Sequence, residues 1–195
     1  MCLRVMPGHP RPTDSPSTQA AIVVLSFAML IREEDLADHR AIAALHTAAF
    51  GRDYEATLVG RLRRERVVEA SLVAAQGEEL LGHILFSTLG VEVDGRKVKA
   101  AALAPLSVAP TQQRKGVGSA LVRAGIAALR ERGLEAIVVL GHPNFYPRFG
   151  FSAPLASRLA APFRGEAFMA LELVPDALAG QAGSVAYAQA FGLGP

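Results

Sequence analysis

Two glycines and two cations share the segment Gln113-Arg-Lys-Gly116-Val-Gly118-Ser119, which lies between an apolar run and an amphipathic stretch. A helix that begins here exposes its first N–H groups, and these favour a phosphate together with the positive end of the helix dipole. Glycine lets a ligand approach the backbone because no Cβ intervenes. The segment predicts an anion-binding turn, although a tight connection without a ligand would use the same residues.

Two common phosphate-binding motifs do not fit this turn. The nucleoside-triphosphate loop has lysine after its glycine, whereas Lys115 precedes Gly116. The dinucleotide fingerprint needs a third small residue where Leu121 stands. The five histidines, at positions 9, 39, 46, 83 and 142, show no metal-ligand clustering. We therefore expect neither of these nucleotide sites and no metal.

The elements that must position the turn read as strand, helix and strand. The apolar run Ala100–Val108 ends at Ala109-Pro110, which is typical of a buried strand. An apolar stripe over Ser119–Arg132 predicts an amphipathic helix that Gly133 ends, and Ala136–Leu140 is a short apolar strand. These elements predict a βαβ unit with two parallel neighbours.

The residues before this unit predict two helices followed by antiparallel strands. Helical spacing covers Asp35–Phe50, with Asp35 as N-cap, and Arg52–Arg66. Two strands, Ser71–Ala75 and Leu80–Glu92, join at Gln76-Gly77, and Asp94-Gly95 is a hairpin signal. The sequence therefore predicts an α/β (α+β) fold with a mixed, mostly antiparallel central sheet.

Composition limits the class of protein. A chain of 195 residues suits one domain, and 51% hydrophobic with 19% charged residues excludes a wholly disordered chain. The one cysteine, Cys2, allows no intramolecular disulfide and fits a reducing cytoplasm. The uncharged apolar run Ala20–Ile31 is shorter than the ~20 residues that a membrane helix needs, so we expect no membrane partner.

We expect three parts in the chain. Residues 1–27 are predicted as a disordered N-terminal tail and lead-in, with a signal peptide as the alternative. Residues 28–174 form the domain. Residues 175–195 are predicted as a peripheral C-terminal appendage with a helix from Val185 to Phe191.

Three motifs in order resemble one family. They are Leu103-Ala-Pro-Leu-Ser-Val108-Ala-Pro110, Gln113-x-x-Gly116-x-Gly118 and Tyr146-Pro-Arg-Phe-Gly150-Phe151, placed around the βαβ unit. In this order they are similar to the GNAT superfamily of acetyl-CoA-dependent N-acetyltransferases, over roughly residues 29 to 174. The resemblance implies that the parallel strands splay apart and that helices flank the sheet on both faces.

The resemblance also implies a coenzyme site. The turn would hold the diphosphate of acetyl-CoA, the pantetheine arm would fill the gap between the splayed strands, and the N–H at or beside Val108 would face the thioester oxygen. No metal takes part. The residues implied in coenzyme binding are Leu106, Ser107, Val108, Gln113, Arg114, Lys115, Gly116, Val117, Gly118 and Ser119.

The resemblance gives Tyr146 the role of general acid toward the leaving sulfur, and a purely packing aromatic is the alternative. An asparagine that relatives often carry before this tyrosine has no counterpart, since Asn144 lies too close to it. His83 is the candidate base, because an imidazole pKa near 6.5 suits the task; the alternatives are a structural histidine and His142 as the base. Glu33 and Glu34 are expected to be solvated or helix-entry residues.

These residues predict an N-acetyltransferase that moves an acetyl group from acetyl-CoA to a primary amine by direct attack in a ternary complex. The acceptor, a small molecule or a protein, stays open, and so does a homodimer. One alternative is a non-catalytic acyl-CoA-binding regulatory protein. Another reads the arginines of Arg61–Arg66 as a nucleic-acid contact, but no aromatic platform accompanies them, so we expect no nucleic-acid partner.

Overall fold

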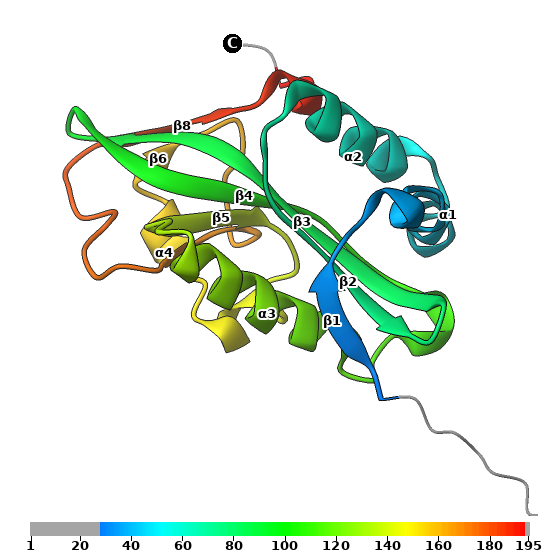
Figure 1. Ribbon diagram of the computed structural model, residues 1–195. Coiled ribbons are helices and arrows are strands. Elements are labelled where there is room, and N and C mark those ends of the chain that lie inside the picture. The colour runs from blue at the N-terminus through cyan, green and yellow to red at the C-terminus, as the bar shows by residue number, and fades with distance from the viewer. Residues whose placement is uncertain (1–27, 194–195) are drawn as a thin grey trace, which may run out of the picture.

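The computed structural model describes residues 28–193, so the predicted tail and the signal-peptide alternative lie outside the described residues. Eight strands form one twisted sheet, as Figure 1 shows, and the expected fold class is confirmed. Six strands lie side by side, and β8 pairs with β3 and with the short β6. In sheet order they are β1 (Leu30–Glu33), β2 (Val68–Gln76), β3 (Glu79–Val93), β4 (Arg96–Val108), β5 (Ala136–Leu140) and β7 (Phe168–Glu172), with β8 (Gly183–Tyr187) and β6 (Leu159–Ala160).

Neighbouring strands along the main path are antiparallel except for β4 and β5. This parallel pair is in register only from Ala100 to Leu103, opposite Ala136 to Val139. β4 continues to Val108, while β5 ends at Leu140. The two strands therefore separate beyond Leu103, as expected for a splayed parallel pair.

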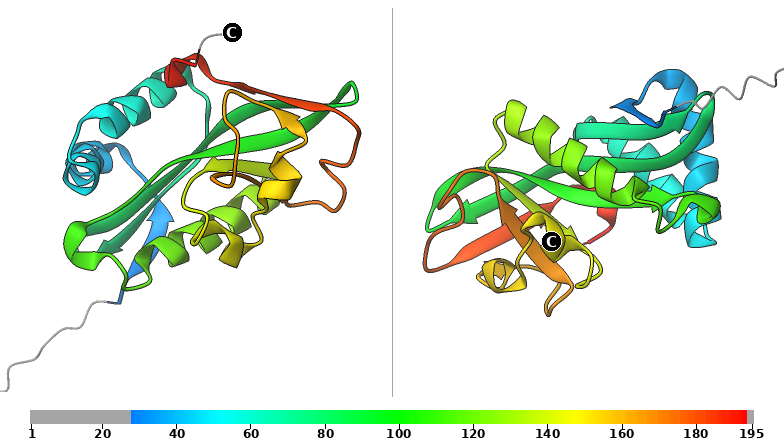
Figure 2. Two further views of the ribbon diagram at one scale, coloured as in Figure 1. Left: turned by 180° about the vertical axis from the view of Figure 1, so that it is seen from behind. Right: turned by 90° about the horizontal axis from the view of Figure 1, so that it is seen from below.

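Helices cover both faces of the sheet (Figure 2). The helices α1 (His39–Phe50) and α2 (Tyr54–Glu65) pack on one face, and α3 (Val117–Glu131) packs on the other. Alternation along β3 explains this, because Leu85 faces the α1 and α2 side whereas Phe86 faces α3. Short turns of helix complete the chain: η1 (Leu36–Asp38), η2 (Pro110–Gln112), η3 (Tyr146–Phe149), α4 (Ala153–Ala156) and η4 (Gln189–Phe191).

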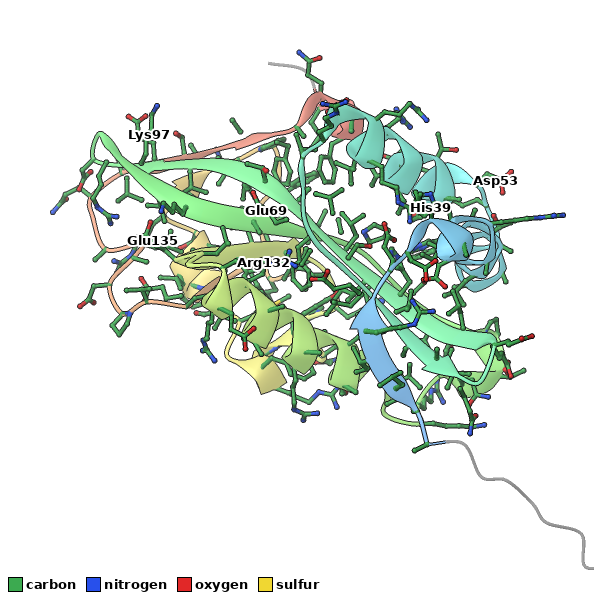
Figure 3. All side chains as sticks on the ribbon, in the orientation of Figure 1. His39, Asp53, Glu69, Lys97, Arg132 and Glu135 are labelled. Carbon is green, nitrogen blue, oxygen red and sulfur yellow. The ribbon has the colours of Figure 1, made fainter. Side chains whose placement is uncertain are left out.

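Local signals account for several boundaries. Asp35 caps η1 and forms a capping box with Asp38, as its N-cap prediction requires. Asp94 and Gly95 both have positive φ, at 48° and 82°, which is the backbone of a two-residue hairpin turn. Lys97 lies near the tip of this hairpin in Figure 3, at a highly charged end of the sheet. The hairpin and cap predictions are therefore confirmed.

The segment after Pro175 differs from its prediction. The expected helix from Val185 to Phe191 is wrong, because Gly183–Tyr187 forms β8 and only Gln189–Phe191 turns into the short η4. The cause lies in β3. Its partner β2 begins at Val68, opposite Ser87, and so leaves Leu89–Val93 with a free edge, which β8 covers. The segment thus extends the sheet. Among residues 28–193, no helix combines the length and apolar character required to cross a membrane.

Candidate active site

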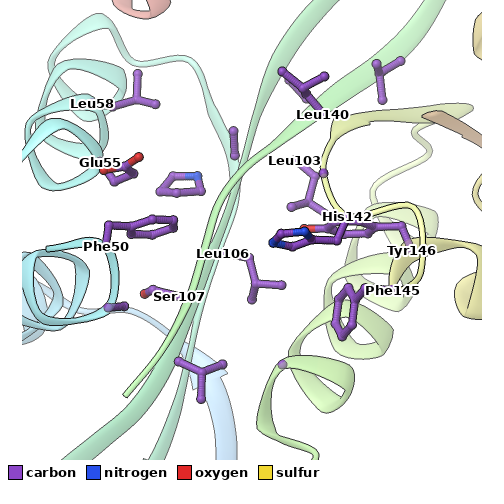
Figure 4. A pocket seen from close by; sticks show the side chains of 18 of the residues that line it. Phe50, Glu55, Leu58, Leu103, Leu106, Ser107, Leu140, His142, Phe145 and Tyr146 are labelled. Atoms are coloured by element: carbon purple, nitrogen blue, oxygen red, sulfur yellow. The ribbon is translucent and has the colours of Figure 1, made fainter. Parts of the chain in front are cut away.

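A large cavity of about 1420 Å³ opens on both sides of the end of β4. Figure 4 shows Phe50, Glu55 and Leu58 on one side of this strand and His142, Phe145 and Tyr146 on the other. We call these two parts the α2 lobe and the α3 lobe. The start of α3 also lines the α3 lobe, with Gly116, Gly118 and Ser119 among the lining residues.

The predicted glycine turn forms the start of α3. Gly116 is its N-cap with φ 92°, and no side chain caps the helix. The first helical bond from this end runs from Ala120 N to Gly116 O at 3.0 Å, so the amides of Val117, Gly118 and Ser119 have no helical acceptor. A Cβ on Gly118 would reach 3.4 Å from Val108 Cγ2. The turn therefore presents amides close to β4, where an anion can bind.

Most of the predicted coenzyme residues line the cavity. Lys115 and Val117 do not line it, and the Val117 side chain is buried in the core beneath α3. Only the backbone of Val117 therefore remains available to a ligand at the turn. The predicted residues that line the cavity are Leu106, Ser107, Val108, Gln113, Arg114, Gly116, Gly118 and Ser119.

The end of β4 directs one amide toward the gap that β5 leaves. Ala109 N donates to Leu81 O of the neighbouring chain segment at 2.9 Å. Because N–H directions alternate along a strand, the N–H of Val108 points away from β3 and toward the gap. The Val108 carbonyl accepts from Gln113 Nε2 at 3.3 Å. This amide is thus placed to donate to a group lying between β4 and β5.

Tyr146 projects from η3 into the α3 lobe, beside His142 (Figure 4). Its ring packs edge-on against Phe145 and Phe151, and burial raises the pKa of the phenol to about 12. A Cβ on Gly141 would lie 2.2 Å from this ring, so only glycine permits the packing. Gly150 ends η3 at φ 93°, and the phenol stays protonated at neutral pH.

His83 lies outside the cavity lining. Its ring is fully buried between β3 and the helices, where Nδ1 lies 2.8 Å from His46 Nε2 and Nε2 lies 2.8 Å from Ser71 Oγ. Ser107, its partner in register on β4, does line the cavity, and the buried Ser107 Oγ has no hydrogen-bond partner. Ser107 thus separates His83 from the cavity.

Glu34 anchors this buried network. Arg63 donates to its two carboxylate oxygens at 2.9 and 2.5 Å, and His83 Nε2 lies 3.3 Å from Oε2. His39, at the start of α1 in Figure 3, lies 3.7 Å from Oε1. Burial raises the pKa of Glu34, but hydrogen bonds from His83, Arg63 and Ser71 outweigh it and hold the pKa well below its usual range. Of the two expectations for Glu34, the solvated one is wrong, because Arg63 pairs with its largely buried carboxylate, whereas the residue does lie at a helix entry, directly before the N-cap Asp35.

Burial lowers the pKa of the two imidazoles, whereas it acts to raise that of a carboxyl group. Desolvation lowers the pKa of His83 and lowers that of His46 to about 3. Both rings are therefore neutral at neutral pH. The tautomer that satisfies most contacts has His83 donating from Nε2 to Glu34 and His46 donating from Nε2 to His83, which leaves His46 Nδ1 as an unpaired acceptor.

Glu55 is a site residue that the sequence reasoning missed. It is 7% exposed, lines the α2 lobe and accepts from Arg52 Nη2 at 2.6 Å and Nε at 3.2 Å. A signal was present, because Glu55 shares one helical stripe with the buried Leu58, Val59 and Leu62. A carboxylate on an apolar helix face is costly to bury unless it is paired, as Arg52 pairs Glu55 here.

The comparisons with known proteins agree with this geometry. The family model described as an acetyltransferase (GNAT) domain matches residues 30–153. The N-acetyltransferase YhbS of Escherichia coli K12 is 37% identical over 166 residues, which are 84% of this chain and 98% of the relative. YjhQ of the same organism, also named an N-acetyltransferase, is 40% identical over 121 residues, 60% of this chain and 66% of the relative.

Solved structures show the same arrangement. A crystal structure of YhbS from Escherichia coli in complex with CoA has a TM-score of 0.77 at 34% identity and covers 96% of this chain and 98% of that one. A GNAT family acetyltransferase from Brucella melitensis, in complex with acetyl-CoA, has a TM-score of 0.70 at 35% identity and covers 85% and 99%. Fold and site define an acyltransferase. The chain belongs to the GNAT acetyltransferase family.

Proposed function

We propose that this protein transfers the acetyl group of acetyl-CoA to a primary amine by direct attack in a ternary complex. The observation that carries the proposal is that one cavity contains the free amides at the start of α3, the gap between β4 and β5, and the phenol of Tyr146. Relatives crystallised with CoA and acetyl-CoA support it. The single cysteine supports a cytoplasmic location.

In this proposal the coenzyme lies in the α3 lobe. The diphosphate accepts from the amides of Gly116 to Ser119, and Arg114 and Lys115 add positive charge from the surface. The pantetheine arm follows β4 into the gap that β5 leaves, which brings the thioester carbonyl to the N–H of Val108. Negative charge develops on that carbonyl oxygen during attack, and a fixed amide stabilises it without reorganising. Affinity for the coenzyme falls with added salt.

Attack forms a bond from the amine nitrogen to the carbonyl carbon, and collapse of the tetrahedral intermediate breaks the bond from carbon to sulfur. The electron pair leaves on sulfur as a thiolate. A phenol with a pKa of about 12 is a weaker acid than a thiol with a pKa of about 8.5. Tyr146 therefore stabilises the thiolate mainly by donating a hydrogen bond, and the thiolate takes its proton afterwards.

The amine must lose a proton, and we propose that His83 receives it, which requires the His46–His83 hydrogen bond to open, because His83 Nδ1 accepts from His46 and Ser107 Oγ has no hydrogen-bond partner. The Ser107 hydroxyl lines the cavity and is the cross-strand neighbour of His83. Burial lowers the pKa of the imidazole, which keeps it neutral but weakens it as a base, and the contact with Glu34 favours the imidazolium that results. His142, which lines the α3 lobe, is the second candidate for this step.

The test is release of coenzyme A across a panel of primary amines, with calorimetric titration of CoA alongside. Tyr146→Phe is expected to bind CoA as the wild type does and to lower kcat about 100-fold, the loss expected for one hydrogen-bond donor to the charge that develops on sulfur. His83→Gln is expected to lower kcat with the same CoA affinity, whereas an unchanged kcat assigns the proton to His142 or water. Tight CoA binding without turnover on any amine would instead identify a binding protein, and absence of CoA binding would overturn the proposal.

A further inference from the structure

The cavity extends to both sides of β4. Its volume of about 1420 Å³ exceeds the ~300–1,000 Å³ of a typical small-molecule pocket. If the coenzyme occupies the α3 lobe, as proposed above, the α2 lobe on the other side of β4 remains for the acceptor (Figure 4). The groups on the wall of the α2 lobe then decide which amines can enter.

One charged group on this wall has the sign that selects a cation. Among the described residues that line the cavity, Glu55 is the only acidic one, and it lies in the first turn of α2, where the helix dipole favours a carboxylate. Its partner Arg52 has a side chain that is 66% exposed, whereas the Glu55 side chain is 9% exposed. An exposed arginine is held weakly and can be displaced by a cation that enters the cavity.

Aromatic side chains form much of the remaining wall. Phe50 and Tyr54 are 41% and 47% exposed, which is high for large apolar residues next to a cavity. The C-terminal segment adds Tyr187 and Phe191, and the Tyr54 hydroxyl donates to the Phe191 carbonyl at 3.3 Å, which joins α2 to η4. These rings offer apolar surface and ring faces that attract a cation.

From this wall we infer that the acceptor is a cationic primary amine on an apolar, preferably aromatic, body. On entry the ammonium replaces Arg52 as the partner of the Glu55 carboxylate, and the body packs against Phe50 and Tyr54. The ammonium then gives up one proton, leaves the carboxylate, and attacks the thioester as the free amine. An amine that carries a carboxylate is rejected, because its anion would lie close to Glu55. The inference rests on the proposed acetyl transfer and adds the class of acceptor to it.

The experiment measures kcat and KM for phenethylamine, and calorimetry follows phenethylamine binding to the protein saturated with CoA. Glu55→Gln, which keeps the shape of the side chain, is expected to raise KM and the dissociation constant about tenfold or more while CoA affinity stays the same. Arg52→Gln is expected to shift both constants in the opposite direction, because it removes the competing cation. A purely structural role of the pair would not produce opposite shifts.

Glu78→Gln, in the exposed β2–β3 turn, is the matched control and is expected to change neither constant. Unaltered thermal unfolding of Glu55→Gln shows that the variant is folded. The inference is overturned if Glu55→Gln and Arg52→Gln shift phenethylamine binding in the same direction or not at all, or if phenylalanine is acetylated as well as phenethylamine. Either result leaves the acetyl transfer intact, whereas a wild type that releases no coenzyme A with any amine contradicts the transfer itself.

Discussion

At the scale of single residues, burial keeps three titratable side chains neutral. The Tyr146 pKa is raised to about 12 and the His46 pKa is lowered to about 3, because in both cases the charged form loses hydration. The His83 pKa is lowered for the same reason. A phenol that keeps its proton can donate to a leaving thiolate, and an imidazole without its second proton can accept one.

The imidazoles predict a pH dependence of stability. The unfolded chain binds a proton at an ordinary histidine pKa of 6.5, whereas folded His46 binds it only near 3. The contribution of His46 is therefore complete above pH 6.5 and is lost as the pH falls toward 3, by up to about 1.4 kcal/mol per pH unit. Glu34, whose folded pKa is also depressed, adds to this loss below pH 4.5.

Urea unfolding between about pH 7.5 and about pH 4.5 measures this slope. In His46→Gln the amide can still donate to His83 Nδ1, so we expect a loss of about 1 kcal/mol at neutral pH and a smaller decrease at acidic pH. The slope contributed by His83 remains. A slope identical to that of the wild type would contradict the assignment of a buried neutral histidine at position 46.

At the scale of elements, two glycines of α3 have opposite roles. A Cβ on Gly125 would lie 2.3 Å from the ring of Phe86, which is fully buried and cannot move aside. A Cβ on Gly118 would only contact Val108 and Phe145 at 3.4 and 3.6 Å, within the cavity wall. Gly125 therefore sets the distance from α3 to the sheet, and Gly118 leaves space for a ligand.

Alanine at these two positions separates folding from coenzyme binding. Gly125→Ala is expected to lower the free energy of unfolding by about 1–3 kcal/mol through overpacking. Gly118→Ala is expected to keep or raise the Tm, since alanine favours a helix, and to weaken CoA binding about tenfold by keeping the diphosphate from the amides. Thermal unfolding and CoA calorimetry measure both. Equal losses of stability in the two variants would contradict this division.

The sequence predicted these elements where local chemistry determines them. The strand Ala136–Leu140 has its predicted ends, and the cap at Asp35 and the turn at Asp94 have the expected geometry. The strand Gly183–Tyr187 was missed because its reason is distant: the free edge of β3 is almost one hundred residues earlier in the chain. Local patterns do not report which edge a later segment meets.

The candidate site divides in the same way. The glycine turn and Tyr146 lie on continuous motifs, and the structure brings both to one cavity. The alternation along the strand predicts which face His83 lies on, but not whether its ring reaches the cavity. On that one face, Ser107 lines the cavity, whereas the neighbouring His83 contacts His46 of α1 and is buried. Glu55 was overlooked because its carboxylate meets the other lining residues only after folding.

At the scale of the whole molecule, the C-terminal elements β8 and η4 line the same cavity as α1 and α2. η4 lies beside α2 in Figure 1, and Ala190 N donates to Glu65 at 3.1 Å. β8 holds this segment in place, since Ala186 pairs with Gly90 of β3, and Tyr187 and Phe191 line the cavity. The division of the chain at Pro175 stays a prediction, but residues beyond it complete the wall of the α2 lobe.

Loosening β8 should therefore affect the two ligands unequally. Ala186→Pro removes the N–H that faces β3 at this register, while Ala186→Ser keeps it and serves as the control. We expect Ala186→Pro to increase hydrogen exchange in β8 and along Leu89–Val93 and to raise KM for the amine severalfold. CoA binding should change less, because the amides at the start of α3 lie on the other face of the sheet from the cluster that β8 joins. A parallel loss of CoA affinity in Ala186→Pro would mean that both lobes depend on the C-terminal strand and that the acceptor wall is not an independent part of the molecule.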